Sequence, residues 1–535
     1  MPKNSTQPVI LVVDDLYDAF TALLENLKRY ADGKLYSNFE FIYLDSYQSL
    51  VEWYKNNQGR FVSLIIQDVD FTHTTSPQKL LQATDLWKIP PKRFDERALQ
   101  GFLIYGLLRS KPIDRFVPVL FVSSRIGLDT TRNFAEYLVY PGYGSCTFAP
   151  DYDQSETFYH RIASLIDSFA LRPLSSAQKE EWKEYHSMVL GRSRLMCHLV
   201  YEIERIAPTE ATVVILGSPG VGKELVANVI HKKSYRYDPE MKEKSKPLTV
   251  NIAALDRNLI EDELFGHERG AFTGATGMRE GIFEAAAGST VFLDEIGDLS
   301  KEIQLKLLRT MEYKTIKRLG SSREIEVDFR VICATNRTIE QLQKSLRSDF
   351  YARLVQHCLI VPSMREKWAN ESYDVVENDI WELCNFFVEK MNTDPRIMAK
   401  IGISNAVIKF ISKLAWEYVE GGNELFAGNI RTLRNLIERA YERCQYEGQK
   451  EISLGHIIST LGMMRLLERP PISQPIKPHE LNIESVVGSL NLAEIEKRAI
   501  LEALTKTGHN QTQAAELLNI HRDTLRKKMQ EYGID

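Results

Sequence analysis

The chain has 535 residues, too many for a single hydrophobic core, and this length predicts roughly three or four domains. Its composition, 44% apolar and 26% charged, is that of a folded globular protein and excludes a disordered or fibrous chain. The formal net charge of −5 excludes a general electrostatic attraction to nucleic acid, so any DNA contact has to come from a local basic surface.

The cysteines and the lengths of the apolar runs indicate the compartment. The six cysteines are scattered without C-x-x-C spacing, which predicts reduced thiols rather than disulfides or zinc ligands. The first residues lack the apolar core of a signal peptide, and no run approaches the roughly 18 apolar residues of a membrane span. We therefore expect a cytoplasmic protein without a membrane partner.

The first third of the chain alternates apolar runs with segments of helical periodicity. The apolar runs are Val9–Val13, Phe39–Leu44, Val62–Ile66, Val117–Val122 and Cys146–Phe148, and the helical segments are Phe20–Tyr30, Tyr47–Tyr54, Leu103–Arg109, Asn133–Leu138 and Phe158–Phe169. The alternation predicts a parallel, doubly wound sheet whose functional edge is the carboxyl end of its strands. Asp14, Asp15 and Asp68 follow two of these strands, so their carboxylates are expected to converge on a divalent cation, and a central one can accept a phosphoryl group.

This region resembles the flavodoxin-like receiver domain of response regulators, with Asp68 at the phosphoacceptor position and Ser123 or Ser124 at the switch hydroxyl. Receivers carry a lysine before a proline after the fifth strand, whereas Phe148–Pro150 here reads Phe-Ala-Pro. The polar segment Phe71–Gln100 is also longer than a receiver needs. Two interpretations stay open: a receiver phosphorylated by a sensor histidine kinase, or a pseudo-receiver that keeps the fold and dimer surface without that chemistry.

A glycine-rich loop, GSPGVGKE, lies between the apolar run Ala211–Leu216 and the helical pattern Leu225–Ile230 and fits G-x-x-x-x-G-K. Only glycine lets backbone N–H groups approach phosphate oxygens this closely at a positive helix end. Lys223 is expected to reach the β- and γ-phosphates, although Glu224 stands where most such loops carry the Mg²⁺-binding Ser or Thr. The predicted nucleotide-binding residues of the loop are Gly217, Ser218, Pro219, Gly220, Val221, Gly222, Lys223 and Glu224.

The second half of a nucleotide site is predicted by the run Thr290–Glu295, a buried strand that ends in two acids. Asp294 is expected to hold Mg²⁺ and Glu295 to polarise the attacking water. Asn336 follows the apolar strand Phe329–Ala334, where it can orient the water near the γ-phosphate or simply cap the strand end. The two halves together predict an ATPase with ATP and Mg²⁺ as cofactors.

Between these halves lies ELFGHERGAFTGA, residues 263–275, which a generic ATPase does not need. An aromatic flanked by glycines predicts a mobile exposed loop whose apolar tip contacts a partner. The motif resembles the signature of bacterial enhancer-binding proteins, the NtrC-type AAA+ activators of sigma-54 RNA polymerase, and the likeness extends roughly from Val189 to Leu467. It implies a nucleotide-dependent contact with sigma-54 through Gly270, Ala271, Phe272, Thr273, Gly274 and Ala275. It also accounts for Glu224, because the phosphate loops of this family typically end G-K-E.

The same resemblance implies further catalytic roles. Asn251 matches the asparagine that restrains the catalytic glutamate until the loop engages its partner. Arg347 and Arg353 match the arginine fingers that reach into the neighbouring subunit's site and so tie hydrolysis to an oligomeric ring, from dimer to hexamer. Without the motif, these arginines would be interpreted as surface helix residues.

A helical lid is expected after the ATPase sheet, in segments Val407–Tyr418, Asn429–Tyr446 and Leu454–Leu467. Arg431 matches the sensor arginine of the family's lid. The usual Trp-Pro before the glycine is replaced by Phe426 and Ala427, and the usual glutamate by a threonine. We expect nucleotide sensing to persist with an altered hinge.

The C-terminal part begins with the proline-rich linker Pro470–Pro478 and continues with three helical patterns. These are Leu492–Thr505, a short helix 510–518 that Asn510 can cap, and His521–Gln530, which predict a helix-turn-helix. It resembles the Fis-type module of the same activators. The residues expected to bind double-stranded DNA are Thr512, His521, Arg522, Thr524, Arg526, Lys527 and Lys528, with 521, 522 and 524 at base edges or nearby phosphates and 526–528 at the backbone.

The sequence thus predicts a three-domain transcriptional activator. The expected divisions are a receiver-like regulatory domain 1–172, a linker 173–187, an AAA+ α/β subdomain 188–365, its helical lid 366–468, a linker 469–482 and an all-α helix-turn-helix domain 483–535. Its ring is expected to remodel the closed sigma-54 promoter complex with ATP. A chaperone-like ATPase with assembly helices, and a DNA-binding repressor with a vestigial ATPase, are the alternatives.

Overall fold

The computed structural model describes residues 7–29, 34–57, 60–71, 73–74, 79–85, 100–110, 116–123, 146–150, 156–241, 244–369, 371–395, 400–467, 497, 500–501, 503–504, 507, 510–518 and 522–534. The chain divides into two compact units, Met1–Leu461 and Gly462–Asp535. Within the described residues, no helix combines the length and apolar character that a membrane span requires. The described cysteine side chains are all free thiols, as expected from their spacing.

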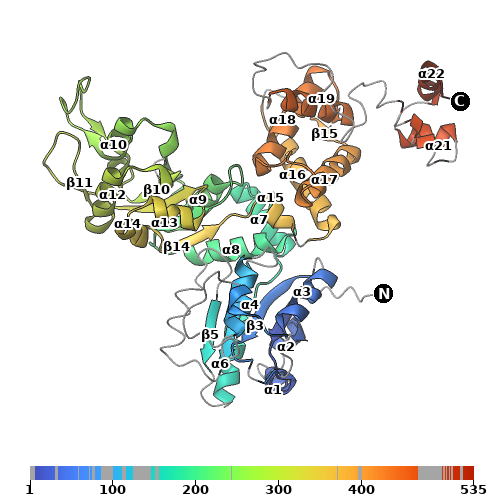
Figure 1. Ribbon diagram of the computed structural model, residues 1–535. Coiled ribbons are helices and arrows are strands. Elements are labelled where there is room, and N and C mark those ends of the chain that lie inside the picture. The colour runs from blue at the N-terminus through green and yellow to red at the C-terminus, as the bar shows by residue number, and fades with distance from the viewer. Residues whose placement is uncertain are drawn as a thin grey trace. The chain divides into compact units, whose positions relative to one another are not determined.

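The N-terminal part is a five-stranded parallel sheet in the order β2-β1-β3-β4-β5 (Figure 1). Its strands are β1 (Val9–Val13), β2 (Glu40–Leu44), β3 (Val62–Asp68), β4 (Val119–Ser123) and β5 (Cys146–Pro150). Helices α1 (Tyr17–Arg29) and α6 (Glu156–Phe169) cover one face, and α3 (Tyr47–Asn56) and α4 (Gln100–Ser110) cover the other. The short α2 (Lys34–Asn38) and a 3₁₀ turn, η3 (Ala83–Asp85), complete it. This strand order is the flavodoxin-like one and confirms the predicted doubly wound fold; the predicted helix Asn133–Leu138 lies outside the described residues.

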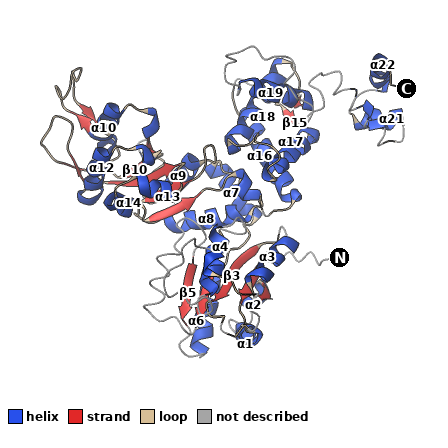
Figure 2. Ribbon diagram, in the orientation of Figure 1, coloured by secondary structure: helices blue, strands red, loops and turns tan. Residues whose placement is uncertain are grey.

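The central sheet is also parallel and runs β14-β6-β13-β10-β7. Figure 2 draws its strands as red arrows among blue helices, with β10 labelled. Its strands are β6 (Val213–Leu216), β7 (Leu248–Asn251), β10 (Ser289–Asp294), β13 (Phe329–Thr335) and β14 (His357–Ile360). Helices α7 (Ser176–His186), α8 (Arg194–Ile206) and α9 (Lys223–Lys232) pack on one face. The other face is covered by α10 (Arg257–Phe265), α11 (Ile282–Ala285), α12 (Lys301–Tyr313), α13 (Ile339–Ser345) and α14 (Ser348–Leu354). Burial on both faces explains why these strands are continuous apolar runs.

Short elements decorate the edges of this sheet. Two antiparallel pairs, β8 (Gly266–His267) with β9 (Arg279–Glu280) and β11 (Thr315–Ile316) with β12 (Ile325–Glu326), frame two protruding loops. Two 3₁₀ turns, η5 (Ile252–Ala254) and η6 (Ile296–Asp298), follow β7 and β10. They place polar backbone directly beyond the carboxyl ends of the central strands.

The lid follows β14 and is helical, as predicted. It contains α15 (Met364–Trp368), α16 (Tyr373–Asn392), α17 (Asn405–Val419), α18 (Asn429–Tyr446) and α19 (Leu454–Leu467), with a small parallel pair, β15 (Gly402–Ile403) and β16 (Glu451–Ile452). A buried carboxylate, Asp379 of α16, joins α15 to α16 and the lid to the segment before α8: it accepts hydrogen bonds from the Trp368 indole at 2.9 Å and the Arg192 N–H at 2.7 Å, and it pairs with Lys367 at 3.0 Å. Removing one partner of such a buried pair is strongly destabilising.

The C-terminal unit contains α21 (Gln511–Leu517) and α22 (Arg522–Tyr532). Asn510 caps α21 as predicted, since its Oδ1 accepts from the N–H groups of Thr512 at 3.1 Å and Gln513 at 3.3 Å. A small core holds the helices together through Ile500, Ala503, Leu504, Ala514, Ala515, Leu525 and Met529. Alanines at 514 and 515 allow the close approach that a helix-turn-helix requires.

Candidate functional site

The glycine-rich loop leaves β6 and ends at the first residue of α9. Gly222 is the residue before the helix and adopts φ 102°, a left-handed conformation that glycine accepts without strain. The N–H groups of the first turn of α9 therefore face the loop, as anion binding requires. The Lys223 ammonium donates a hydrogen bond to the carbonyl of Gly217 at 2.8 Å, so its side chain lies across the loop.

The acidic residues reach this loop from the neighbouring strands. Asp294 ends β10, and its Cα is paired with that of Asn251 at the end of β7. The Asn336 N–H, just after β13, donates to Oε2 of Glu295 at 3.1 Å. Burial lowers the pKa of Lys223, while Glu295 and Asp294 act in the opposite direction. The structure thus gathers the predicted lysine and acids at one edge of the sheet.

Asn251 lies beside this cluster without holding the glutamate. Within the described residues, no hydrogen bond joins Asn251 to Glu295; the carboxylate is bound to the backbone of Asn336 instead. This hydrogen bond gives the Glu295 carboxylate a defined resting position beside the end of β13. The role of Asn251 inferred from family resemblance stays a prediction.

The lid contributes Arg431 and a residue that the sequence analysis missed, Asn429. The Arg431 N–H donates to the carbonyl of Gly220 at 3.2 Å, and a Cβ on Gly220 would lie only 2.2 Å from the Gly428 carbonyl oxygen. Asn429, at φ 54°, donates from Nδ2 to the carbonyl of Pro219 at 3.0 Å and accepts the Met364 N–H at 2.9 Å. The lid therefore rests on the phosphate loop through this buried asparagine. A non-glycine residue tolerant of left-handed backbone, next to a glycine, was the available signal.

A second missed feature is an apolar cavity of about 120 Å³ beside the phosphate loop. Its lining is contributed by the segment before α8, by the start of α9, by the end of β14 and by the lid. Lining residues include Met188, Val189, Val221, Leu225, Val361 and Ile430. Such a surface suits the flat apolar faces of a nucleobase. Sequence reasoning missed it because its residues come from segments that are far apart along the chain.

The GAFTGA loop protrudes between β8 and β9. Gly270 and Gly274 have φ values of 85° and 102°, and a Cβ on either would meet open space. The loop closes on itself, because the Gly270 N–H donates to the Ala275 carbonyl at 2.9 Å. Phe272 is 45% exposed at the tip, its ring centroid 5.0 Å from that of His267, and Thr273 is exposed too. The expected exposed apolar tip is present.

The base of this loop is fixed by ion pairs that the sequence analysis did not identify. Arg318, after β11, contacts Glu284 through two hydrogen bonds of 2.6 and 3.0 Å and Glu268 through one of 2.9 Å. These hydrogen bonds to the carboxylates hold the pKa of Arg318 above its usual range. The bidentate geometry fixes orientation as well as charge. The base of the loop is therefore tied to the body of the domain, whereas Phe272 and Thr273 at its tip are exposed.

The two predicted arginine fingers are surface residues of α14 and its cap. Arg347 precedes the helix and pairs with Asp349 at 2.8 Å, whereas the Arg353 side chain is exposed. In the described part of the chain, no hydrogen bond or ion pair connects either arginine to Lys223 or the acids. Arg353 therefore presents an exposed guanidinium, whereas the Arg347 guanidinium is held by the Asp349 carboxylate through two hydrogen bonds.

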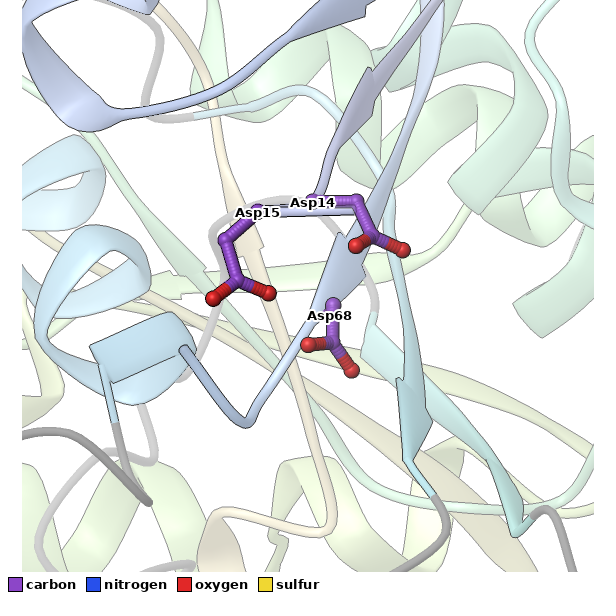
Figure 3. A group of neighbouring side chains, drawn as sticks. All are labelled: Asp14, Asp15 and Asp68. Carbon is purple, nitrogen blue, oxygen red and sulfur yellow. The ribbon is translucent and has the colours of Figure 1, made fainter. Parts of the chain in front are cut away.

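In the N-terminal sheet, Asp14, Asp15 and Asp68 do converge: one carboxylate oxygen from each lies within 4.8 Å of the others (Figure 3). Burial raises the pKa of Asp14 to about 6 and also raises the pKa of Asp15 and Asp68. Thr74, from the long segment after β3, donates to Asp15 at 3.1 Å. Such a cluster is stabilised by a divalent cation or a proton.

The predicted DNA-binding residues are arranged on the second C-terminal helix. Arg522, Thr524, Arg526 and Lys527 are exposed on α22, Lys528 is half-buried, and Thr512 is exposed on α21. His521 lies outside the described residues. The basic surface that the overall charge lacks is therefore concentrated on one helix.

Comparison with known proteins adds the following matches. Residues 189–359 match the sigma-54 interaction domain, and residues 491–532 match the Fis family of bacterial regulatory proteins. The transcriptional regulatory protein ZraR of Escherichia coli O157:H7 is 32% identical over 495 residues, covering 88% of this chain and 98% of that protein. The regulatory protein AtoC of Escherichia coli K12 is 35% identical over 371 residues, 68% of this chain and 71% of that protein. NtrX from Brucella abortus in complex with ADP has 22% identity and a TM-score of 0.43, covering 98% of this chain and 100% of that one.

Proposed function

Because this chain belongs to the family of sigma-54-dependent transcriptional activators, which join an AAA+ ATPase to a Fis-type DNA-binding module, we propose how its residues divide the work. Lys223 and the N–H groups of the loop 217–224 bind the phosphates of ATP. The apolar cavity beside the loop takes the adenine. Arg431 senses the phosphates from the lid, and the Asn429 contact couples the position of the phosphate loop to that of the lid helices.

Hydrolysis is assigned to the edge formed by β10, β13 and β7. Asp294 is a carboxylate at a strand end beside the phosphate loop, a donor suited to Mg²⁺, which would neutralise charge between the β- and γ-phosphates. Glu295 orients and deprotonates the attacking water, and Asn336 positions it. Asn251 restrains the glutamate in the coupled state. Arg347 and Arg353 complete the site of the next subunit in a ring, from dimer to hexamer.

The output is assigned to the loop 270–275. Phe272 and Thr273 contact sigma-54 and transmit the hydrolysis cycle to the closed promoter complex, while α22 holds upstream double-stranded DNA. The protein is expected to act in the cytoplasm, because these partners are found there. The N-terminal domain, 1–172, controls assembly, and a sensor histidine kinase acting on Asp68 is its proposed input. The segment 173–187, whose helix α7 packs on the ATPase sheet, connects the N-terminal domain to the ATPase 188–365 and its lid 366–468, and the linker 469–482 connects the lid to the module 483–535.

One observation carries this proposal: an exposed aromatic on a self-closed loop, anchored at its base by Arg318, projects from an ATPase that does not need it. Phe272→Ala removes the apolar tip without altering the nucleotide site. We expect the ATPase rate to stay within about twofold, while sigma-54-dependent open-complex formation falls at least about tenfold.

The matched control is Met278→Ala, since Met278 is 53% exposed in the same segment but outside the motif. It is expected to leave both readouts unchanged. Normal transcription by Phe272→Ala would favour the chaperone-like alternative. Absence of ATP turnover in the purified protein would favour the DNA-binding repressor with a vestigial ATPase.

A further inference from the structure

The backbone of Glu295 is held in an unusual conformation. It adopts φ 56°, left-handed for a non-glycine residue, directly between β10 and the turn η6. Such a conformation persists only where surrounding contacts enforce it. Its carboxylate is also bound, through the Asn336 N–H at 3.1 Å. The position of this glutamate therefore depends on η6 at one end and on the residues after β13 at the other.

Arg337 joins these two ends. Its Nη2 lies 2.5 Å from Oδ1 of Asp298, the last residue of η6. Its side chain crosses the turn so closely that a Cβ on Gly297 would be 2.7 Å from the Arg337 Cδ and 2.8 Å from its Nε. The Arg337 N–H also donates to Thr335 Oγ1 at 3.2 Å, which fixes the arginine to the end of β13. Asn336, which binds the glutamate, is thus the immediate neighbour of a residue tied to the glutamate's own turn.

We propose that Arg337 and Asp298 are positioning residues for hydrolysis: their ion pair across Gly297 sets the distance between η6 and the Asn336 N–H, and so the orientation of the Glu295 carboxylate. This inference rests on the proposed role of Glu295 as the residue that activates water. Arg337 acts through Glu295 and not by contact with the nucleotide. Small displacements of a catalytic group lower the rate strongly, because the reacting atoms have to be aligned.

The solvent exposure of the Arg337–Asp298 pair allows a positioning role to be distinguished from a merely structural one. Its side chains are 33% and 44% exposed, and exposed ion pairs contribute little to global stability. Breaking it should therefore leave the thermal midpoint nearly unchanged. The turnover number, in contrast, should respond because the left-handed turn is free to relax.

The test uses the full chain, with kcat, KM for ATP, ADP affinity, thermal midpoint and oligomer size measured for each variant. Arg337→Gln and Asp298→Asn are each expected to lower kcat about fivefold, with KM and ADP affinity within about twofold of the parent. The double variant should be no slower than either single one, since both remove the same contact. Arg337→Lys keeps the charge and should recover part of the loss, and Gly297→Ala should reproduce it by steric displacement of Arg337.

Glu295→Gln tests the proposed role of the glutamate separately from the positioning role of Arg337 and Asp298. If it abolishes hydrolysis while Arg337→Gln and Asp298→Asn keep the parental kcat, the positioning inference is overturned and the proposed function stands. If Glu295→Gln hydrolyses ATP normally, the proposed role of the glutamate itself fails. Additive losses in the double variant, or a raised KM in Arg337→Gln alone, would show that Arg337 contacts the nucleotide and would also overturn the inference.

Discussion

The contact of the lid with the phosphate loop depends on one buried side chain, Asn429, which is 1% exposed. Asn429→Ala removes the hydrogen bond to the Pro219 carbonyl and the one from the Met364 N–H. Asn429→Gly removes the same two bonds but suits the φ of 54° better. The pair of variants therefore separates the loss of the side chain from the strain of the backbone.

The expected magnitudes follow from these contacts. Each of the two lost bonds costs about 1 kcal/mol, and each of the two backbone groups left unpaired adds about 1 kcal/mol, so the side chain is worth ~4 kcal/mol. Alanine in the left-handed region costs about 1 kcal/mol more than glycine. We expect Asn429→Ala to be the less stable variant, by roughly 2 to 4 °C in the thermal midpoint relative to Asn429→Gly.

The assay is thermal unfolding of the full chain with and without ADP. Both variants should gain less stabilisation from ADP than the parent, because the lid no longer follows the loop. The prediction would be wrong if Asn429→Ala were as stable as the parent protein, or if Asn429→Gly were less stable than Asn429→Ala. Asn423→Ala serves as the control, since the hydrogen bonds of the Asn423 side chain lie within the lid, to the Leu414 carbonyl and from the Leu425 N–H.

Two further predictions concern the terminal domains. Burial raises the pKa of Asp14 to about 6, so between about pH 4 and 6 the folded protein keeps a proton that the unfolded chain has lost, and stability falls as pH rises through that window. Asp14→Asn should therefore raise the free energy of unfolding of the N-terminal domain at pH 8, by up to about 3 kcal/mol, and leave it unchanged at pH 4; a gain that is equal at both pH values would contradict this. On α22, Arg526→Ala and Lys527→Ala should each weaken DNA binding and lower the salt slope by about 1, whereas Gln530→Ala, exposed on the same helix, should not.

The parts that the sequence predicted well are those set by local pattern. Parallel strands buried on both faces read as apolar runs, and the functional groups at their carboxyl ends, such as Asp294 and Asn336, follow directly from where each run stops. The phosphate loop was predictable because the close approach of its backbone to phosphate requires glycines, and these glycines are close together in the sequence. The exposed tip at Phe272 was predictable for the same reason, since flanking glycines and an aromatic are adjacent in sequence.

The parts that the sequence left out are set by contacts between distant segments. Asn429 and Pro219 are 210 positions apart, and Arg318 and Glu284 are 34 apart, so no window of periodicity contains either pair. The resting contact of Glu295 is another case: the resemblance pointed to Asn251, one strand to one side, while the bond goes to Asn336, one strand to the other. The order of the strands in the sheet has to be known before the hydrogen-bond partner of Glu295 can be predicted.

The N-terminal domain separates two properties that receivers usually combine. The three carboxylates at the edge keep the cation-binding geometry, within 4.8 Å of one another, but β5 ends in Ala149 and Pro150, without the lysine that would pair with an aspartyl phosphate. A phosphoryl group on Asp68 would therefore have to be neutralised mainly by a divalent cation. If phosphorylation does regulate this protein, the modified state should depend on that cation more steeply than in a receiver with its lysine. Inserting the lysine as Ala149→Lys should reduce that dependence, measured as the lifetime of the phosphorylated form against Mg²⁺ concentration; an unchanged dependence would contradict the idea that the missing lysine makes the modified state rely on the cation.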